Sequence, residues 1–279
     1  MNADKKICAE LIGGLGNQLF QISNAYILSQ RFKTKFVINF DRFFCGQGNH
    51  PSKYFSTLYL NIKPYIGELS THSIAYAEKG FAYYNHNTDI LALLEGNNEI
   101  HMKGYWQSEH YFSNKKNELR ELFNMKFPFL HIPKHVFLDN PAIHDITNTS
   151  CLICVRRGDY LKNPQIHNPC GMTYFNRAIT HFPSSTKFFI ISDDLKWCME
   201  NFKGDQFVFL DIKDDLVTLS VGALFNNYII SNSTFYWWMS YFSIYEAPTI
   251  VAPDKWINIS HHQSIYRSEM IIIERPIEV

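Results

Sequence analysis

Short apolar runs alternate with stretches of helical periodicity along the chain, most regularly in its second half. Parallel strands need a crossover between them, usually a helix, so this alternation predicts parallel α/β sheets. Residues 127–149 carry three prolines and read as a connection. We therefore predict an α/β fold of two domains, with the boundary near the end of this connection. The predicted strands are residues 7–12, 35–40, 100–106, 151–155, 187–191, 207–210, 228–230 and 249–252, and the predicted helices include residues 107–123, 174–181, 195–201, 216–225 and 235–245.

The predicted domains span residues 1–148 and 149–279, with a C-terminal tail able to pack back on the first. Apolar residues make up 46% of the 279-residue chain, which is enough to bury a sizeable core. Lys plus Arg and Asp plus Glu are both 26, so no global charge would attract nucleic acid or an acidic membrane. Any anion site must therefore be local.

We expect a cytoplasmic protein. The first residues lack the apolar core of a signal peptide. The longest stretch without charge, residues 216–245, is interrupted by asparagines and serines, which argues against a membrane span. Cys151 and Cys154 lie three apart on one predicted strand and so point to opposite faces, which disfavours a disulfide or a shared metal.

The strand at residues 151–155 ends in two adjacent arginines, a glycine and an aspartate. Ligands of open α/β sheets bind outside the carboxyl ends of the strands. Two guanidiniums there, Arg156 and Arg157, favour a phosphate or pyrophosphate, because the guanidinium fork matches phosphate oxygens. Only Asp159 stands beside them. A structural Arg–Asp pair at a strand end explains these residues about as well.

A glycine turn follows the first predicted strand and opens a helix, through Gly13, Gly14 and Gly16. Such a turn aims backbone N–H groups and the positive end of the helix at an anion. Asn17 and Gln18 add side-chain donors there. The turn lacks the last glycine of a dinucleotide fingerprint and the G-K-[ST] of a P-loop. It is a weak signal, because many such turns only close a βα unit.

Three strands of the second half end in polar residues, and these ends should meet at one edge of the sheet. Besides the arginines, they are Asp193 with Asp194, and the run Ser231, Asn232, Ser233 and Thr234. The run precedes a helix and offers hydroxyls and free N–H groups to a phosphate, or caps that helix. Asp193 and Asp194 suit a metal, a ribose or a helix cap. Asp214 and Asp215 also precede a helix.

The sequence gives little sign of a metal site. It has no D-x-D, and Pro133 separates His131 from His135, which prevents a helical zinc pair. Without a metal, arginine would have to neutralise a leaving pyrophosphate.

Five ordered segments resemble the α-1,2-fucosyltransferases, and the resemblance spans roughly residues 7–256. The arginine-aspartate segment, residues 156–160, also looks like that of α-1,6- and protein O-fucosyltransferases. The segments are residues 13–21, 104–109, 156–160, 191–194 and 231–238.

This resemblance implies the GT-B arrangement of two Rossmann-like domains facing a cleft. It implies an inverting, metal-independent enzyme without a cofactor, which moves L-fucose from GDP-fucose to the 2-hydroxyl of a terminal galactose. It further implies a cell-surface glycan pathway, at most peripheral membrane association through a lipid-linked acceptor, and no nucleic-acid partner.

The resemblance also assigns residues. Arg156 would hold the β-phosphate, Arg157 and Asp159 would shape the donor site, and Asp193 and Asp194 would lie near the donor. Asp215 would read guanine, and residues 231–234 would contact the phosphates. The Gly14–Asn17 turn would close the site, and acceptor contacts would come from near Trp106, Gln107 and Glu109. Asp159 is a candidate general base by residue type alone.

One position departs from the family. Cys154 stands where the family commonly has histidine, in H-x-R-R-x-D, and a thiol is a poor hydrogen-bonding group. This departure is the only support for the first of two alternatives to an active transferase. The first is a protein that binds a nucleotide or glycan without turnover. The other is a nucleotide-dependent oxidoreductase, suggested by Gly14, Gly16 and Asp41.

Overall fold

The computed structural model describes residues 4–39, 48–68, 70–258 and 264–276. The chain forms two compact units. The first comprises Met1–Asn124 with His262–Tyr266, and the second comprises Met125–His261 with Arg267–Val279. The boundary predicted from the sequence lies later, at 148/149. Residues 125–148 group with the second unit instead, and only the short segment His262–Tyr266 of the tail groups with the first.

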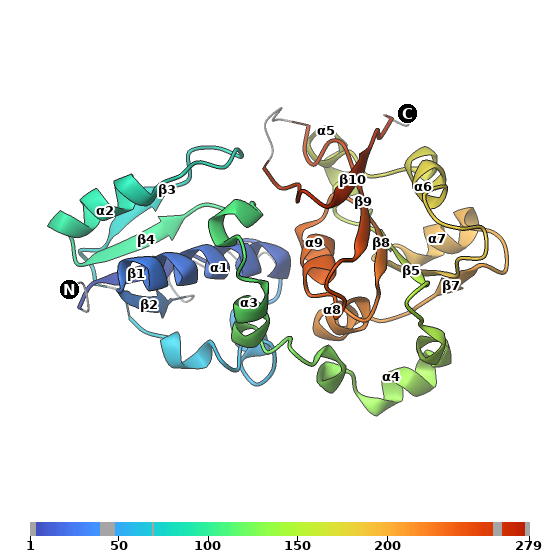
Figure 1. The fold of residues 1–279 in the computed structure, drawn as a ribbon, viewed down its shortest axis with the longest axis horizontal. Coiled ribbons are helices and arrows are strands. Elements are labelled where there is room, and N and C mark those ends of the chain that lie inside the picture. Colours follow the sequence, from blue (N-terminus) through green and yellow to red (C-terminus); the bar gives the residue numbers. More distant parts are fainter. Residues whose placement is uncertain (1–3, 40–47, 69, 259–263, 277–279) are drawn as a thin grey trace. The chain divides into compact units, whose positions relative to one another are not determined.

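The first unit is built on a four-stranded parallel sheet of order β2-β1-β4-β3. Helix α1 (Leu15–Phe32) connects β1 to β2 and buries Leu19 and Ile22. Helix α2 leads from β3 into β4, and α3 follows β4 (Figure 1). The bounds are β1 Lys6–Ala9, β2 Lys35–Ile38, β3 Ile74–Ala77, α2 Asn87–Gly96, β4 Glu99–Lys103 and α3 Lys116–Leu122.

The second unit is built on a six-stranded parallel sheet of order β10-β9-β8-β5-β6-β7. Helices α6 and α7 cover one face, and α8 and α9 lie on the other (Figure 1). A short helix, α4, precedes the sheet. The bounds are α4 Lys134–Asp139, β5 Cys151–Val155, α5 Pro164–His167, α6 Met172–Ile179, β6 Phe188–Ser192, α7 Leu195–Asn201, β7 Phe207–Phe209, α8 Asp215–Gly222, β8 Asn227–Ile230, α9 Thr234–Tyr241, β9 Thr249–Pro253 and β10 Met270–Ile273.

The core of the second unit explains why its strands read as continuous apolar runs. All five residues of β5 are buried, because helices cover both faces of a parallel sheet. Ile153 and Val155 pack with Phe175 of α6 on one face. The thiol of Cys154 faces the other, where its Sγ lies 3.9 Å from Sδ of Met239. The predicted α/β class with parallel sheets is therefore correct.

The predicted helix over 107–123 is wrong as a single element. The structure has a 3₁₀ turn at Glu109–Phe112 and then α3, which begins only at Lys116. Asn114 between them has φ 62°, the left-handed conformation that a continuous helix does not permit. Strands β3 and β10 had no predicted counterpart. The cysteines at 8, 151, 154, 170 and 198 are free and buried, so the 151/154 pair forms no disulfide.

No helix within the described ranges is long and apolar enough to span a bilayer.

Candidate active site

The carboxyl ends of β5 and β8 define a switch point in the second sheet. From β5 the chain proceeds outward to β6 and β7, and it then returns to β8 on the opposite side of β5. Ligands of such sheets bind in the crevice at that point. Arg156 follows β5 and Ser231 follows β8, and the backbone N–H of Arg156 donates to Oγ of Ser231 at 3.1 Å. The predicted convergence of these two strand ends is therefore present.

Arg156 carries a charge that two carboxylates hold in place. Its Nη2 lies 2.8 Å from Oδ1 of Asp159, and its Nη1 lies 3.2 Å from Oδ2 of Asp193. Its Nε is buried and has no hydrogen-bond partner. Burial lowers the pKa of this guanidinium, but the carboxylates, Asp193 foremost, outweigh burial and leave the pKa above its usual value. The group thus stays charged, with a third of its side chain exposed.

Arg157 is held more tightly and in a different way. Its backbone N–H donates to Oδ1 of Asp193 at 2.9 Å, and its Nε donates to Oδ2 of Asp194 at 3.3 Å. Its guanidinium lies over the ring of Trp197, 4.0 Å from the ring centre. Only 16% of the side chain is exposed. Arg157 is thus fixed by α7, whereas Arg156 is the more accessible of the two.

The two aspartates after β6 serve the local structure. Asp194 accepts from the N–H of Trp197 at 3.1 Å and so caps α7. Asp193 bridges the two arginines through its two oxygens. Gly158 lies so close to Asp193 that a Cβ at position 158 would come within 2.8 Å of Oδ2. A side chain there would disturb the pair.

The run from Ser231 to Thr234 is largely buried, and its first two side chains are used internally. Oγ of Ser231 donates to the carbonyl of Cys154 at 2.8 Å. The Asn232 amide donates to the carbonyls of His167 at 2.6 Å and Trp256 at 2.8 Å. Ser233 occupies the N-cap position of α9, without a side-chain cap bond, and Thr234 is its first residue. The run therefore braces the switch point; contact with donor phosphates stays a prediction.

Asp215 is the first residue of α8, after β7, and its carboxylate accepts from the N–H of Leu216 at 3.0 Å. Asp214 caps the same helix by accepting from the N–H of Val217 at 3.0 Å. Both aspartates thus lie at the start of α8 and bond to its first N–H groups, in keeping with their predicted position before a helix. The reading of guanine by Asp215 stays a prediction. Cys154 is fully buried, and burial raises the pKa of its thiol, so this side chain is part of the core.

The first unit has its own switch point, between β1 and β4. After β1, Gly13 has φ 78°, a conformation that favours glycine, and a Cβ there would meet the Asn17 side chain. Gly14 is the N-cap of α1, and its carbonyl accepts from the N–H groups of Asn17 and Gln18 at 3.0 and 3.1 Å. Gly16 lies buried in the first turn of α1.

Gln18 is not a free donor. Its side chain is fully buried; Nε2 donates to the carbonyls of Gly13 and Asn49, both at 3.2 Å, and Oε1 accepts from the hydroxyl of Tyr59 at 3.2 Å. The amide therefore fixes the glycine turn. Asn17 is partly exposed, and its Oδ1 accepts from Nε2 of Gln107 at 3.0 Å.

The turn after β4 is organised by Glu78. This half-buried carboxylate accepts from the N–H groups of Tyr105 at 2.7 Å and Trp106 at 3.0 Å. Trp106 has φ 56° and its ring is buried, so it supports the turn and offers little surface. Gln107 and Glu109 remain partly exposed. Acceptor contact by this turn stays a prediction.

Sequence reasoning did not single out Glu78, Tyr160, His167 or Trp197. Tyr160 donates to the carbonyl of Asn232 at 2.9 Å and stacks on His167, with ring centres 4.2 Å apart. Among these four residues, only Trp197 had a signal in the sequence, namely its position three residues after the capping Asp194. Within the described residues, no group of three or more His, Cys, Asp or Glu side chains is placed to hold a metal ion. Asp41 of the oxidoreductase alternative lies outside the described residues.

The family model described as Glycosyl transferase family 11 matches residues 7–274, nearly the whole chain. The chain belongs to glycosyl transferase family 11. The family expected from the five ordered segments is therefore confirmed, and the protein is a glycosyltransferase.

Two curated relatives from Escherichia coli support this assignment. An alpha-1,2-colitosyltransferase is 26% identical over 278 residues, covering 90% of this chain and 92% of the relative. The O-antigen biosynthesis glycosyltransferase WbnK is 23% identical over 288 residues, covering 88% of this chain and 93% of the relative.

A solved structure agrees on the fold. The NodZ alpha-1,6-fucosyltransferase co-crystallised with GDP has a TM-score of 0.50 and 12% identity, covering 85% of this chain and 91% of that one. The predicted class, α/β with two Rossmann-like domains of the GT-B type, is confirmed.

Proposed function

We propose that this family 11 glycosyltransferase moves L-fucose from GDP-fucose to the 2-hydroxyl of a terminal galactose, with inversion and without a metal. The observation that carries the proposal is Arg156, a charged and accessible guanidinium at the switch point of the second sheet. The identity of the donor and acceptor rests on the resemblance of residues 156–160 and their companions to the α-1,2-fucosyltransferases.

In this proposal the diphosphate of the donor competes with the carboxylates that hold Arg156. Asp159 is the easier to displace, because half of its side chain is exposed, against 25% for Asp193. A phosphate takes one edge of the guanidinium and keeps the charge balanced. Asp159 is then free to accept the proton of the attacking hydroxyl, which gives it a role as general base.

The transition state resembles an oxocarbenium ion, and negative charge grows on the leaving β-phosphate as the sugar bond breaks. A fixed positive charge beside that oxygen is worth more in the transition state than in the ground state, and so raises the rate. Arg156 and the N–H groups at the start of α9 would supply this stabilisation.

The proposal is tested by incubating the protein with GDP-fucose and methyl β-galactoside, followed by linkage analysis of the product. We expect an α-1,2-linked fucoside and release of GDP that depends on the acceptor. Arg156→Ala should lower turnover by a factor of about 10²–10³. Arg177→Ala, which removes an exposed arginine of α6, is the matched control and should retain full activity. Near-normal transfer by folded Arg156→Ala would refute the role of the arginine.

Metal independence is tested separately. We expect EDTA to leave the rate of transfer largely unchanged, since arginine neutralises the leaving group in this proposal. Complete loss of activity, restored by a divalent ion, would overturn this part.

The colitosyltransferase relative favours a second candidate, transfer of colitose from GDP-colitose to the same hydroxyl. The two donors compared on one acceptor decide between them through kcat/KM. A protein that only binds its ligand would release no GDP above the blank without acceptor. Each outcome identifies one of the three readings.

A further inference from the structure

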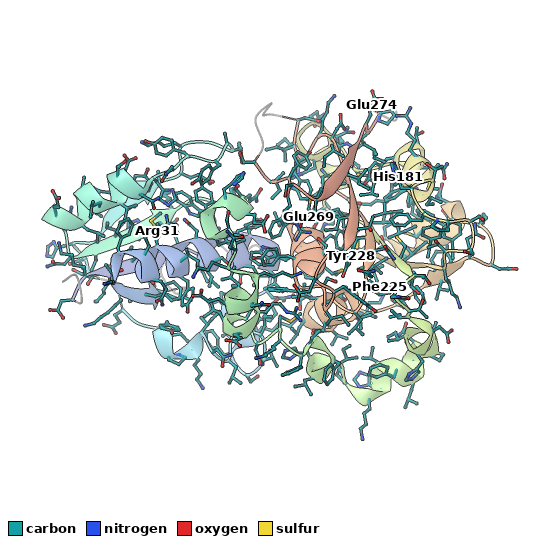
Figure 2. All side chains as sticks on the ribbon, in the orientation of Figure 1. Arg31, His181, Phe225, Tyr228, Glu269 and Glu274 are labelled. Carbon is teal, nitrogen blue, oxygen red and sulfur yellow. The ribbon has the colours of Figure 1, made fainter. Side chains whose placement is uncertain are left out.

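A hollow lies within the first unit, away from the glycine turn. It sits between α1, the residues that lead into α2, and the 3₁₀ turn Glu109–Phe112, and the empty space along its lining, open solvent at its mouth included, is about 190 Å³. Asn24 and Arg31 contribute from α1, and Tyr83, His86, His110 and Tyr111 contribute from the other segments. Figure 2 marks Arg31 on its helix.

Asn24 lines the hollow and is completely buried, yet neither atom of its amide has a hydrogen-bond partner. Buried polar groups are nearly always paired, and leaving an amide unpaired is costly. The amide offers two donors and one acceptor oxygen. A hydroxyl group, which both donates and accepts, would complement it. The space within the hollow that a water-sized group can occupy is about 10 Å³, which admits a hydroxyl and leaves the rest of a ligand at the mouth.

The walls of the hollow are aromatic and its mouth is open. The ring of Tyr83 lies 5.0 Å from the rings of both His110 and Tyr111, and 37% of Tyr83 is exposed. Aromatic rings with polar tips present an apolar face together with hydrogen-bonding groups, which suits the apolar face and hydroxyls of a sugar ring. None of the described lining residues is acidic, so the hollow does not favour a cationic ligand.

The hollow is linked to the turn after β4 but separate from it. The ring of His86 lies 5.0 Å from that of Tyr111 and 5.2 Å from that of Trp106. Along α1, Asn24 follows Gly14 by ten residues, or about 15 Å of helix rise. A ligand in the hollow would therefore lie well beyond the glycine turn.

We propose that this hollow binds a sugar residue of the acceptor other than the one that is modified, with a hydroxyl of that sugar bonded to the Asn24 amide and its ring against Tyr83. The proposal rests on the proposed function. It implies that the enzyme prefers an oligosaccharide to a single galactoside.

The test compares methyl β-galactoside with a β-galactose-terminated tetrasaccharide, lacto-N-tetraose, as acceptors. In the unaltered protein we expect kcat/KM to be at least about tenfold higher for the tetrasaccharide than for methyl β-galactoside. Asn24→Leu and Tyr83→Leu should bring the ratio close to one, while kcat/KM for methyl β-galactoside changes less than twofold. Asn176→Leu, an exposed substitution on α6, is the matched control and should keep the ratio.

Two measurements without donor separate this proposal from the proposed function. Ligand-observed NMR with lacto-N-tetraose should show binding to the unaltered protein and loss of binding to Asn24→Leu. The midpoint of thermal unfolding of Asn24→Leu should not fall, because an amide without partners is replaced by an apolar group. Binding without any transfer would refute the proposed function and support sugar binding in the hollow. Transfer with equal kcat/KM for both acceptors, and NMR binding unaffected by Asn24→Leu, would overturn the hollow alone.

Discussion

The guanidinium of Arg157 lies 4.0 Å from the centre of the Trp197 ring, and its Nε bonds to Asp194, which caps the same helix. The neighbouring Arg156 has no such platform; its ring contact, with Tyr160, is at 5.6 Å. Adjacent arginines thus have different surroundings. Arg157 is a positioning residue that ties the end of β5 to α7, whereas Arg156 is available to a ligand.

This difference predicts unequal effects on nucleotide binding. Arg156→Gln should weaken the binding of GDP strongly, because it removes the accessible charge. Arg157→Gln should weaken it less, and should lower stability, because it removes the link to α7. Titration calorimetry with GDP and urea unfolding measure the two effects. If the two variants lose GDP affinity equally and keep equal stability, the assignment of roles fails.

The Arg157–Trp197 contact itself can be measured with a double-mutant cycle. Cation–π contacts of largely buried groups contribute about 1–2 kcal/mol. We expect a coupling free energy of that size between Arg157→Gln and Trp197→Leu in urea unfolding. The cycle cancels the packing that Trp197 loses against Phe175 and Phe202. A coupling near zero would reduce the contact to coincidental proximity.

The two carboxylates on Arg156 should also respond differently to amidation. Asp159→Asn should lower kcat sharply while GDP binds as tightly or more tightly, because the arginine is released and the general base is lost. Asp193→Asn should instead lower stability, because it weakens the bond to the Arg157 N–H as well as the ion pair. Turnover, GDP affinity and urea unfolding separate the cases. Full turnover in Asp159→Asn would exclude it as the base.

Much of this arrangement could be predicted from the sequence. The buried strand before Arg156 and the helix over Leu195–Asn201 follow from local pattern, and the meeting of strand ends follows from parallel topology. The partners of Arg157 could not be predicted, because its position over Trp197 depends on how α7 packs. The hydrogen-bond partners of Gln18 could not be predicted for the same reason. A polar side chain beside a glycine turn looks like a free donor until its buried partners are known.

The structure also holds features with no local signature. Strand β3 lies in a region of uneven pattern, and β10 pairs with β9 only through a distant return of the chain. The predicted helix over 107–123 ignored Asn114, whose left-handed backbone breaks it. Asn24 sits on the helix that follows the glycine turn, where the pattern gives no reason to expect a hollow.

Glu78 should matter to the turn after β4 far more than its position in the sequence suggests. Burial raises the pKa of its carboxyl, and two N–H bonds oppose that rise. Glu78→Ala leaves the N–H groups of Tyr105 and Trp106 without an acceptor, at about 1–3 kcal/mol for each buried group. We expect a clear loss of stability in urea unfolding, and a smaller loss for Glu78→Gln, which keeps one acceptor oxygen. Equal behaviour of the two variants would contradict the role of the paired bonds.

The titration of His86 should make the stability of the first unit depend on pH. Burial, reinforced by the positive charge of Arg31, lowers the pKa of its imidazole to about 4, from an ordinary value of about 6.5; the carbonyl of Tyr84 and the carboxylate of Asp89 oppose the change. The folded protein therefore binds fewer protons than the unfolded chain between these two pH values. The contribution of His86 to stability is complete above about pH 6.5 and is lost as the pH falls toward 4.

The expected size follows from the shift, since one pKa unit corresponds to about 1.4 kcal/mol and the window covers about 2.5 units. His86→Phe keeps a ring in contact with Trp106 and Tyr111 but cannot titrate. The free energy of unfolding should therefore fall between pH 7 and pH 4 by up to about 3 kcal/mol more in the unaltered protein than in His86→Phe. Glu78 and Glu10, whose pKa values burial raises, act in the opposite direction but equally in both proteins. Urea unfolding across this range measures the difference, with the exposed His181→Phe as control, and parallel curves for unaltered protein and His86→Phe would show that His86 does not control the pH response.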